Sequence, residues 1–157
     1  MDKEKTAKYV DPNNARPGHA YEGVIKAIAE EKVCPFCPEQ LANFHKQPVE
    51  IDGIYWLATK NQYPYTCVRH HLLLIHKAHI EHVEELSPEA WVELKEIITK
   101  LNRGREIAGG TFMLRFGETT YTGASVTHLH AHIIQSDPDH ERYREPKSMP
   151  GVIARVG

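Results

Sequence analysis

The stretch His128-Leu129-His130-Ala131-His132-Ile133-Ile134 decides the fold of this chain. Successive side chains of a β-strand point to opposite faces, so three histidines share one face of such a strand and Leu129, Ala131 and Ile133 share the other. The apolar face can pack on a helix, while the other presents imidazoles roughly 6.6 to 7 Å apart between alternate residues. The sequence therefore predicts a strand over residues 128–134 with a functional site on one face.

The histidine row leaves several interpretations. A surface strand that holds histidines by chance would not alternate so regularly with apolar residues, and the remnant of a purification tag would be terminal. Metal binding by all three histidines is a stronger alternative, because neutral imidazole is a common ligand. The preceding loop, Gly117 to Gly123 followed by Ala124-Ser125-Val126, offers glycines, N–H groups and a hydroxyl that suit a phosphate. Beside the imidazoles, this loop indicates attack on phosphorus by a neutral histidine.

The flanking segments predict an α+β fold with a mainly antiparallel sheet. Apolar residues recur at helical spacing over residues 20–32, and Ser87-Pro88-Glu89 starts a second helix, whose apolar stripe from Trp91 to Leu101 runs through to about Asn102. Further strands are predicted at residues 49–51, 54–58, 71–76 and 111–116, the first two joined by a two-residue Asp52-Gly53 turn. This order lacks the βαβ alternation of a parallel sheet.

Length and composition predict one globular domain. The chain has 157 residues, 41% hydrophobic and 25% charged, which suits one soluble domain and is too short for two ordinary ones. Loop chemistry predicts a flexible arm over residues 1–19, the domain over 20–137 and a C-terminal extension over 138–157. The net charge of −2 argues against a nucleic-acid polymer as partner, but a small anionic ligand needs only a local site.

The N-terminal residues and the hydropathy of the chain predict where in the cell the protein is located. No apolar run approaches the roughly 20 residues of a membrane-spanning helix, so no membrane partner is expected. Met1 to Lys8 is charged and lacks an apolar signal segment, which makes a cytoplasmic location the expectation.

Cys34-Pro35-Phe36-Cys37 is the second informative motif. In a cytosolic chain a C-x-x-C indicates a metal or redox site and not a structural disulfide. No thioredoxin-like βαβ pattern surrounds it, which argues against the redox role, and two buried inert thiols remain an alternative. A tetrahedral structural metal site needs two more ligands, and the histidines near His71 offer several candidates.

Together these motifs resemble the histidine-triad superfamily of nucleotide hydrolases and transferases. Residues 128–134 match the triad motif at every position, and Asn61, Tyr63-Pro64-Tyr65 and the run from His71 to His79 resemble the family's central strand and the loop before it. Cys34 to Cys37 is similar to the opening motif of the zinc-binding variant. The resemblance implies the histidine-triad fold, a five-stranded antiparallel sheet with flanking helices, and a homodimer.

The resemblance also implies roles for particular residues. His130 would be the nucleophile that attacks the α-phosphorus and forms a covalent nucleotidyl–enzyme intermediate, which water or another acceptor resolves. His132 would contact the phosphate and Ser125 would lie near the bridging or leaving oxygen, so these three form the implied catalytic set. The other implied substrate-binding residues are Gly123 and Val126 at the phosphate, Asn61 at the ribose hydroxyls and Phe36 at the base, although Phe36 also suits the core.

The metal and the cofactors follow from the same resemblance. It selects His79 and His128 to complete a structural zinc site with Cys34 and Cys37. No organic cofactor and no catalytic metal are expected.

Three functions stay open at this point. The prediction is a nucleotide hydrolase that acts on dinucleoside polyphosphates or nucleoside phosphoramidates. A nucleotide phosphorylase or nucleotidyltransferase is the first alternative, because Gly123-Ala124-Ser125 is similar to those branches; their motif usually has Gln in place of His132, however, which favours the hydrolases. A nucleotide-binding zinc protein of low turnover is the second alternative.

Overall fold

The computed structural model describes residues 9–18, 20–145, 147 and 150–154. Its centre is a five-stranded sheet in the order β1-β2-β3-β5-β4, antiparallel at every pairing. The strands are β1 (Val49–Asp52), β2 (Trp56–Lys60), β3 (Val68–His76), β4 (Thr111–Arg115) and β5 (His130–Ser136). The predicted α+β class and antiparallel five-stranded sheet are confirmed.

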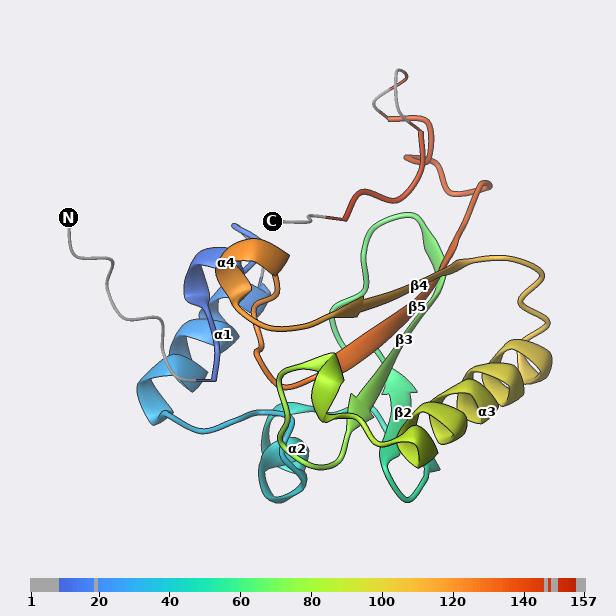
Figure 1. Cartoon of the computed structure of the whole chain (residues 1–157). Helices are drawn as coiled ribbons and strands as arrows, with labels where there is room; N and C mark the ends of the chain where they lie inside the picture. Colours follow the sequence, from blue (N-terminus) through green and yellow to red (C-terminus); the bar gives the residue numbers. More distant parts are fainter. Residues whose placement is uncertain (1–8, 19, 146, 148–149, 155–157) are drawn as a thin grey trace.

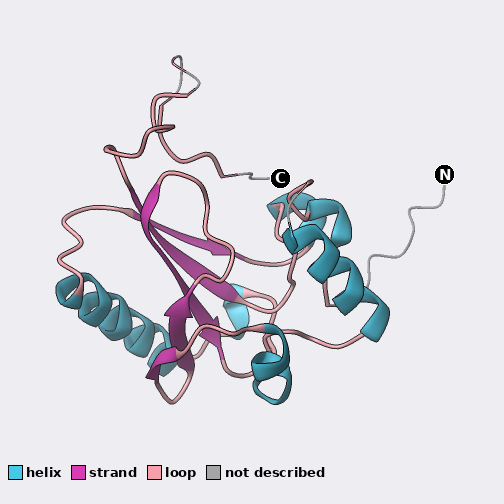
Figure 2. Cartoon of the chain, turned by 180° about the vertical axis from the view of Figure 1, so that it is seen from behind, coloured by secondary structure: helices cyan, strands magenta, loops and turns pink. Residues whose placement is uncertain are grey.

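Helices flank both faces of this sheet. They are α1 (Ala20–Glu31), α2 (Pro38–Phe44), α3 (Pro88–Gly104) and the short α4 (Thr119–Thr122). Figure 1 shows α3 on one side of the sheet and the other three helices on the opposite side, and Figure 2 shows the same layering from behind. No helix among the described residues is long and apolar enough to cross a membrane.

The face that α3 covers holds the largest hydrophobic cluster. Leu129, Ala131 and Ile133 belong to it, as predicted for the apolar face of the histidine strand. Ser87 caps α3, since its side chain accepts the Ala90 N–H at 3.1 Å, and Pro88 is the first helical residue.

The buried face of α3 differs from the predicted apolar stripe at one position. Ala90, Leu94, Ile97 and Leu101 face the sheet, whereas Trp91 is 43% exposed. Residues 90, 94, 97 and 101 follow helical spacing, and Trp91 lies about 100° around the helix from Ala90. Small Ala90 lets the helix approach the sheet, where its carbonyl accepts the Trp56 indole N–H at 2.9 Å.

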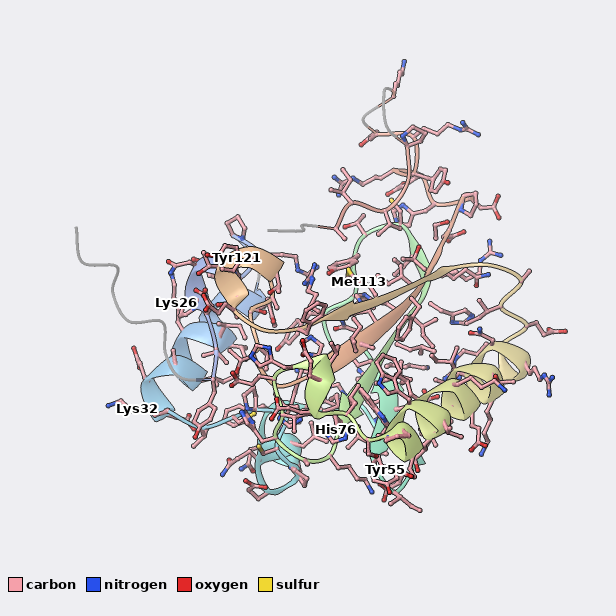
Figure 3. The ribbon with its side chains drawn as sticks, viewed as in Figure 1. Lys26, Lys32, Tyr55, His76, Met113 and Tyr121 are labelled. Carbon is pink, nitrogen blue, oxygen red and sulfur yellow. The ribbon has the colours of Figure 1, made fainter. Side chains whose placement is uncertain are left out.

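The predicted two-residue Asp52-Gly53 turn is wrong. β2 starts at Trp56 and not at Ile54, so a longer loop joins it to β1. The carboxylate of Glu93 on α3 accepts N–H groups from Ile54, Tyr55 and Trp56 at 2.7, 2.7 and 2.8 Å. Glu93, which is distant in sequence, thus accepts the backbone N–H groups that a two-residue turn would have placed in the hydrogen-bonded pairing of the two strands. The Tyr55 carbonyl in this loop accepts the N–H of Lys77, the residue after β3, at 2.7 Å; Tyr55 and the last β3 residue, His76, are labelled in Figure 3.

The segment before α1 is packed against the loop that precedes β5. The Thr127 N–H donates to the Tyr9 carbonyl at 3.0 Å, and the Asp11 N–H donates to the Ser125 carbonyl at 2.9 Å. The Asp11 carboxylate also accepts from the Thr119 hydroxyl at 2.8 Å. Within the flexible arm predicted over residues 1–19, Tyr9 and Asp11 therefore contact the site loop, and residues 1–8 and 19 lie outside the described residues.

Candidate active site and metal centre

A cavity of about 330 Å³ lies on the sheet face opposite α3. All seven residues predicted to bind substrate or to act in catalysis line it: Phe36, Asn61, Gly123, Ser125, Val126, His130 and His132. They come from four separate parts of the chain, which the antiparallel pairing of β3 with β5 and the packing of α1 bring together.

His130 is buried and held in a defined tautomer. Its Nδ1 lies 2.7 Å from the His128 carbonyl oxygen, which can only accept, so Nδ1 carries the proton and Nε2 keeps its lone pair. Burial, more than the nearby charge of Arg115, lowers the pKa of His130 to about 4. The imidazole is therefore neutral near pH 7, which is the state that a nucleophile requires.

His132 and His71 form a hydrogen-bonded pair beside it. The Tyr65 N–H donates to His71 Nδ1 at 3.1 Å, so neutral His71 carries its proton on Nε2, 2.9 Å from His132 Nδ1. His132 then accepts at Nδ1 and carries its own proton on Nε2. That buried Nε2 has no partner among the described residues. A buried donor without a partner is costly, and a ligand oxygen in the cavity would satisfy it.

Burial lowers the pKa values in this pair as well. The pKa of His71 falls to about 4, first through burial and then through the charges of Arg16 and Arg115. Burial also holds the pKa of His132 well below its usual value, and a charge on His130 or His71 would lower it further. The pair is neutral at pH 7.

The loop before β5 supplies further donors. The Ser125 hydroxyl hydrogen-bonds the Tyr21 hydroxyl on α1. Burial raises the pKa of Tyr21, which keeps its phenol protonated. Among the described residues, the N–H groups of Ser125 and Val126 donate to no backbone carbonyl. Gly123 adopts the left-handed conformation, φ 68°, at the end of α4 and turns the chain into this loop.

Asn61 and Phe36 lie on other walls of the cavity. Asn61 Oδ1 accepts the Tyr63 N–H at 2.8 Å, and Asn61 Nδ2 lies 3.0 Å from His71 Nε2. The Phe36 ring stands edge-on to His130, with 5.0 Å between ring centroids. Phe36 also packs on two hydrophobic clusters, so it belongs both to the cavity and to the core.

Two arginines line the cavity, and no carboxylate among the described residues does. Arg115 lies on β4 directly opposite His130 in the strand pairing. Arg16 comes from the segment before α1. The cavity is therefore electropositive in a chain whose net charge is −2, and it suits an anionic ligand.

Cys34, Cys37, His79 and His128 form a second cluster, in which the four ligand atoms all lie within 4.8 Å of one another. His128 Nδ1 lies 3.3 Å from Cys34 Sγ, 3.7 Å from Cys37 Sγ and 3.2 Å from His79 Nδ1, and His79 Nδ1 lies 3.4 Å from Cys37 Sγ. Tetrahedral zinc with ordinary bond lengths requires about 3.6 Å between S and N and about 3.4 Å between two N atoms. The cluster could hold such a metal ion.

The surroundings of both histidines fix Nδ1 as the ligand atom. His128 Nε2 donates to the His76 carbonyl at 2.5 Å, and His79 Nε2 lies 3.2 Å from the Glu81 carboxylate. Such outer partners orient imidazole ligands in metal sites. Burial raises the pKa of Cys37 to about 12, with a further contribution from Cys34. Two thiolates are thus unfavourable here unless a cation compensates them.

The structure differs from the predicted strand at His128. β5 begins at His130, so His128 precedes the strand and lies in the Cys–His cluster while His130 and His132 line the cavity. The predicted row of three imidazoles on one strand is therefore divided between two sites. Pairing with β3 starts at His130, opposite Ile75.

Sequence reasoning missed three residues that line the cavity, Arg16, Tyr21 and Arg115. It also missed His71, which hydrogen-bonds His132. Arg16 lies outside the predicted domain of residues 20–137, as does Ile153, which also lines the cavity. Tyr21 falls in the segment 20–32, for which the sequence predicts only a helix with an apolar stripe. The predicted strand over residues 71–76 could have indicated His71, because alternate residues of a strand share one face. No local sequence pattern indicates that Arg115 lies at the site.

The comparisons with known proteins identify the family of this chain. The profile of the HIT domain matches residues 56–139, more than half of the chain, so the chain belongs to the HIT (histidine-triad) family. No curated protein sequence matches it.

Solved structures share the fold at low sequence identity. A histidine triad nucleotide-binding protein from Candida albicans is 14% identical, with 80% of this chain and 82% of that chain covered and a TM-score of 0.58. A hypothetical histidine triad nucleotide-binding protein from Sulfolobus tokodaii strain7 is 21% identical, covering 67% and 70%, with a TM-score of 0.52. A HIT family hydrolase from Clostridium thermocellum is 21% identical, covering 63% and 86%, with a TM-score of 0.50.

Proposed function

We propose that the protein is a nucleotide hydrolase that acts through a covalent nucleotidyl-histidine intermediate on His130. The observation that carries the proposal is the His130 tautomer: the Nδ1 proton bonds the His128 carbonyl, so Nε2 keeps a lone pair at an electropositive cavity. Its membership of the HIT family and the nucleotide-binding and hydrolase names of the structures that share its fold support the same class.

In the first step, His130 Nε2 attacks the α-phosphorus of the substrate. The P–N bond to His130 forms as the bond from phosphorus to the leaving group breaks, and the leaving group departs with the bonding electron pair. A phosphate leaves as the anion, whereas an amine takes up a proton as it departs. The Ser125 hydroxyl, bonded to Tyr21, supplies a hydrogen bond to the departing atom. In the second step, water attacks phosphorus, the P–N bond to His130 breaks and the nucleoside monophosphate is released.

The other residues position the substrate and stabilise its charge. The His132 Nε2–H and the N–H groups of Ser125 and Val126 bond the phosphate oxygens, whose negative charge increases in the transition state. The turn at Gly123 sets the path of that loop. Phe36 contacts the base, and Asn61 bonds the ribose hydroxyls.

The test is to incubate the protein with a diadenosine polyphosphate, with and without inorganic phosphate, and to identify the products. The expected products are AMP and the departing adenosine polyphosphate, both formed without added phosphate and both lost in the His130→Ala variant. ADP formed only when phosphate is present would favour a phosphorylase, and binding without any product would favour a low-turnover nucleotide-binding protein.

We propose zinc as the ion of the Cys–His cluster, bound by Cys34, Cys37, His79 and His128. Two thiolates and two imidazoles are typical ligands of structural zinc, and the separations of the four atoms agree with a tetrahedral ion. The ion would join the segment before α2 to the turn before β5 and so hold His130 in place. Elemental analysis is expected to give one zinc per chain.

We propose that the protein assembles as a homodimer. β4 is an edge strand with Phe112 43% exposed, and Trp91 and Val92 of α3 are 43% and 57% exposed. An unpaired edge strand and large exposed apolar side chains are each suited to an interface between two copies of the chain. Light scattering at micromolar concentration is expected to give twice 17.9 kDa, and a mass near one chain would contradict the dimer.

A further inference from the structure

We propose that Arg16, which lies in the segment before α1, is a specificity-determining residue that binds the phosphate groups of the leaving group. The inference rests on the proposed function, because it takes the cavity to be the nucleotide site. It adds a substrate preference, namely for leaving groups that carry phosphate over neutral ones.

The first observation is how the Arg16 side chain is held. Nη2 donates to the Tyr63 carbonyl at 2.5 Å and Nη1 donates to the Pro64 carbonyl at 3.3 Å. The guanidinium carbon lies 5.5 Å from the centroid of the Tyr21 ring and 5.2 Å from that of Tyr65. A guanidinium has five N–H groups in a planar fork, so two bonds to carbonyls leave others for a ligand. Since the side chain is already fixed, binding a ligand orders little more of it.

The second observation is where this side chain lies. Arg16 and Tyr65 line the active-site cavity and also a second cavity of about 220 Å³, so they stand at the boundary between the two. His130 and His132 line the first cavity, and Arg142 and Glu145, an ion pair at 3.6 Å, line the second. A substrate attacked at its α-phosphorus by His130 and extending beyond that phosphate has room to pass Arg16.

The third observation is the charge of the surroundings. The first cavity has no carboxylate among its described lining residues, and Arg16 forms no ion pair in the part of the chain that the structure describes. A cation that bonds only carbonyls is incompletely compensated, and an anionic ligand compensates it. A second or third phosphate supplies that charge, whereas a neutral amine does not.

The experiment compares the binding of AMP with that of α,β-methylene-ATP, whose α–β linkage cannot be cleaved. Calorimetry at one ionic strength, without added magnesium, is applied to the wild type and to Arg16→Gln, Arg16→Lys and Arg69→Gln. Arg69 is the matched control, an arginine that pairs with Asp137 and Asp139 and lines neither cavity. The Tm of each variant is measured alongside, because Arg16 also contacts the loop at Tyr63.

The expected result is a wild-type preference for the triphosphate analogue of roughly 10- to 150-fold, the range of a hydrogen bond to a charged group. Arg16→Gln should remove most of this preference and change AMP affinity less than about twofold, while Arg69→Gln retains it and Arg16→Lys retains part of it. Equal losses for both ligands in Arg16→Gln, or a preference that survives the substitution, would overturn the inference.

Binding needs no chemical step, so this result is separable from the proposed reaction. A wild type that discriminates through Arg16 but turns over no nucleotide would contradict the hydrolase and support the role of Arg16. Turnover that depends on His130, with an unchanged preference in Arg16→Gln, would leave the hydrolase standing and refute the role of Arg16. A wild type without any preference for the analogue refutes it as well.

Discussion

His128 and His130 are two residues apart and hold their protons on opposite ring nitrogens. His128 donates from Nε2 to the His76 carbonyl, which leaves Nδ1 for the Cys–His cluster. His130 donates from Nδ1 to the His128 carbonyl, which leaves Nε2 for the cavity. In each case one backbone carbonyl selects the tautomer, and the tautomer determines which ring nitrogen offers its lone pair to the Cys–His cluster or to the cavity. Alternation along a strand cannot make this distinction.

The largest effect is expected on turnover when His130 is replaced. His130→Ala removes the proposed nucleophile, and loss of a nucleophile typically lowers kcat by about 10³-fold or more. AMP binding should remain, because the phosphate donors of Ser125, Val126 and His132 are intact. Product formation and calorimetry on the same preparation check both statements. Free imidazole should restore turnover in His130→Gly, and turnover near that of the wild type in His130→Ala would refute the assignment.

The second-largest effect is expected on folding stability when the Cys–His cluster that contains His128 loses a ligand. Cys34→Ser removes one of the four ligands, so we expect loss of the metal and of roughly 4 kcal/mol or more of folding free energy, which lowers Tm by about 10 °C. Cys67→Ser is the matched control, because Cys67 is a buried cysteine that lies outside the cluster. Elemental analysis and thermal unfolding are the measurements. A metal-free Cys34→Ser protein as stable as the wild type would show that no metal ion at this cluster stabilises the fold.

Local patterns predicted much of both sites, since the alternating histidines, the C-x-x-C and the Ser87 cap are each contained within a few residues. The two-residue turn at Asp52-Gly53 failed because Glu93, about 40 residues away, bonds the loop. Arg115 faces His130 only through the pairing of β4 with β5. Arg16 reaches the cavity because its segment packs on the loop before β5. No short window of sequence contains these contacts, so no local pattern could have revealed them.

A smaller effect is expected from the pH dependence of stability through His71. Its pKa is about 4 in the folded protein, mainly through burial, against about 6.5 when unfolded. The unfolded chain therefore binds more protons between these values, so the stabilisation is complete above pH 6.5 and is lost as the pH falls toward 4. The 2.5-unit difference corresponds to about 3 kcal/mol.

Urea unfolding of the wild type and His71→Gln at pH 7 and pH 4.5 measures this contribution. The variant should lose less stability on acidification than the wild type does. Identical pH dependence in the wild type and His71→Gln would show that His71 does not contribute.

The smallest predicted effect distinguishes two roles of Asn61 next to the His130 site. As a ribose partner, Asn61 contributes about 1–3 kcal/mol to binding a hydroxyl, so Asn61→Ala should lower turnover of a ribonucleotide substrate about 5- to 150-fold and affect a 2′,3′-dideoxy substrate much less. In the structure its Oδ1 already accepts the Tyr63 N–H at 2.8 Å, which makes support of the loop the rival role. The kcat/KM values of both proteins with both substrates form a double-mutant cycle, and equal losses for the two substrates would assign Asn61 to the loop and not to the sugar. In that case Asn61 would already have its partner within the protein. The His132 Nε2–H, which has none among the described residues, would still need a ligand to accept its hydrogen bond.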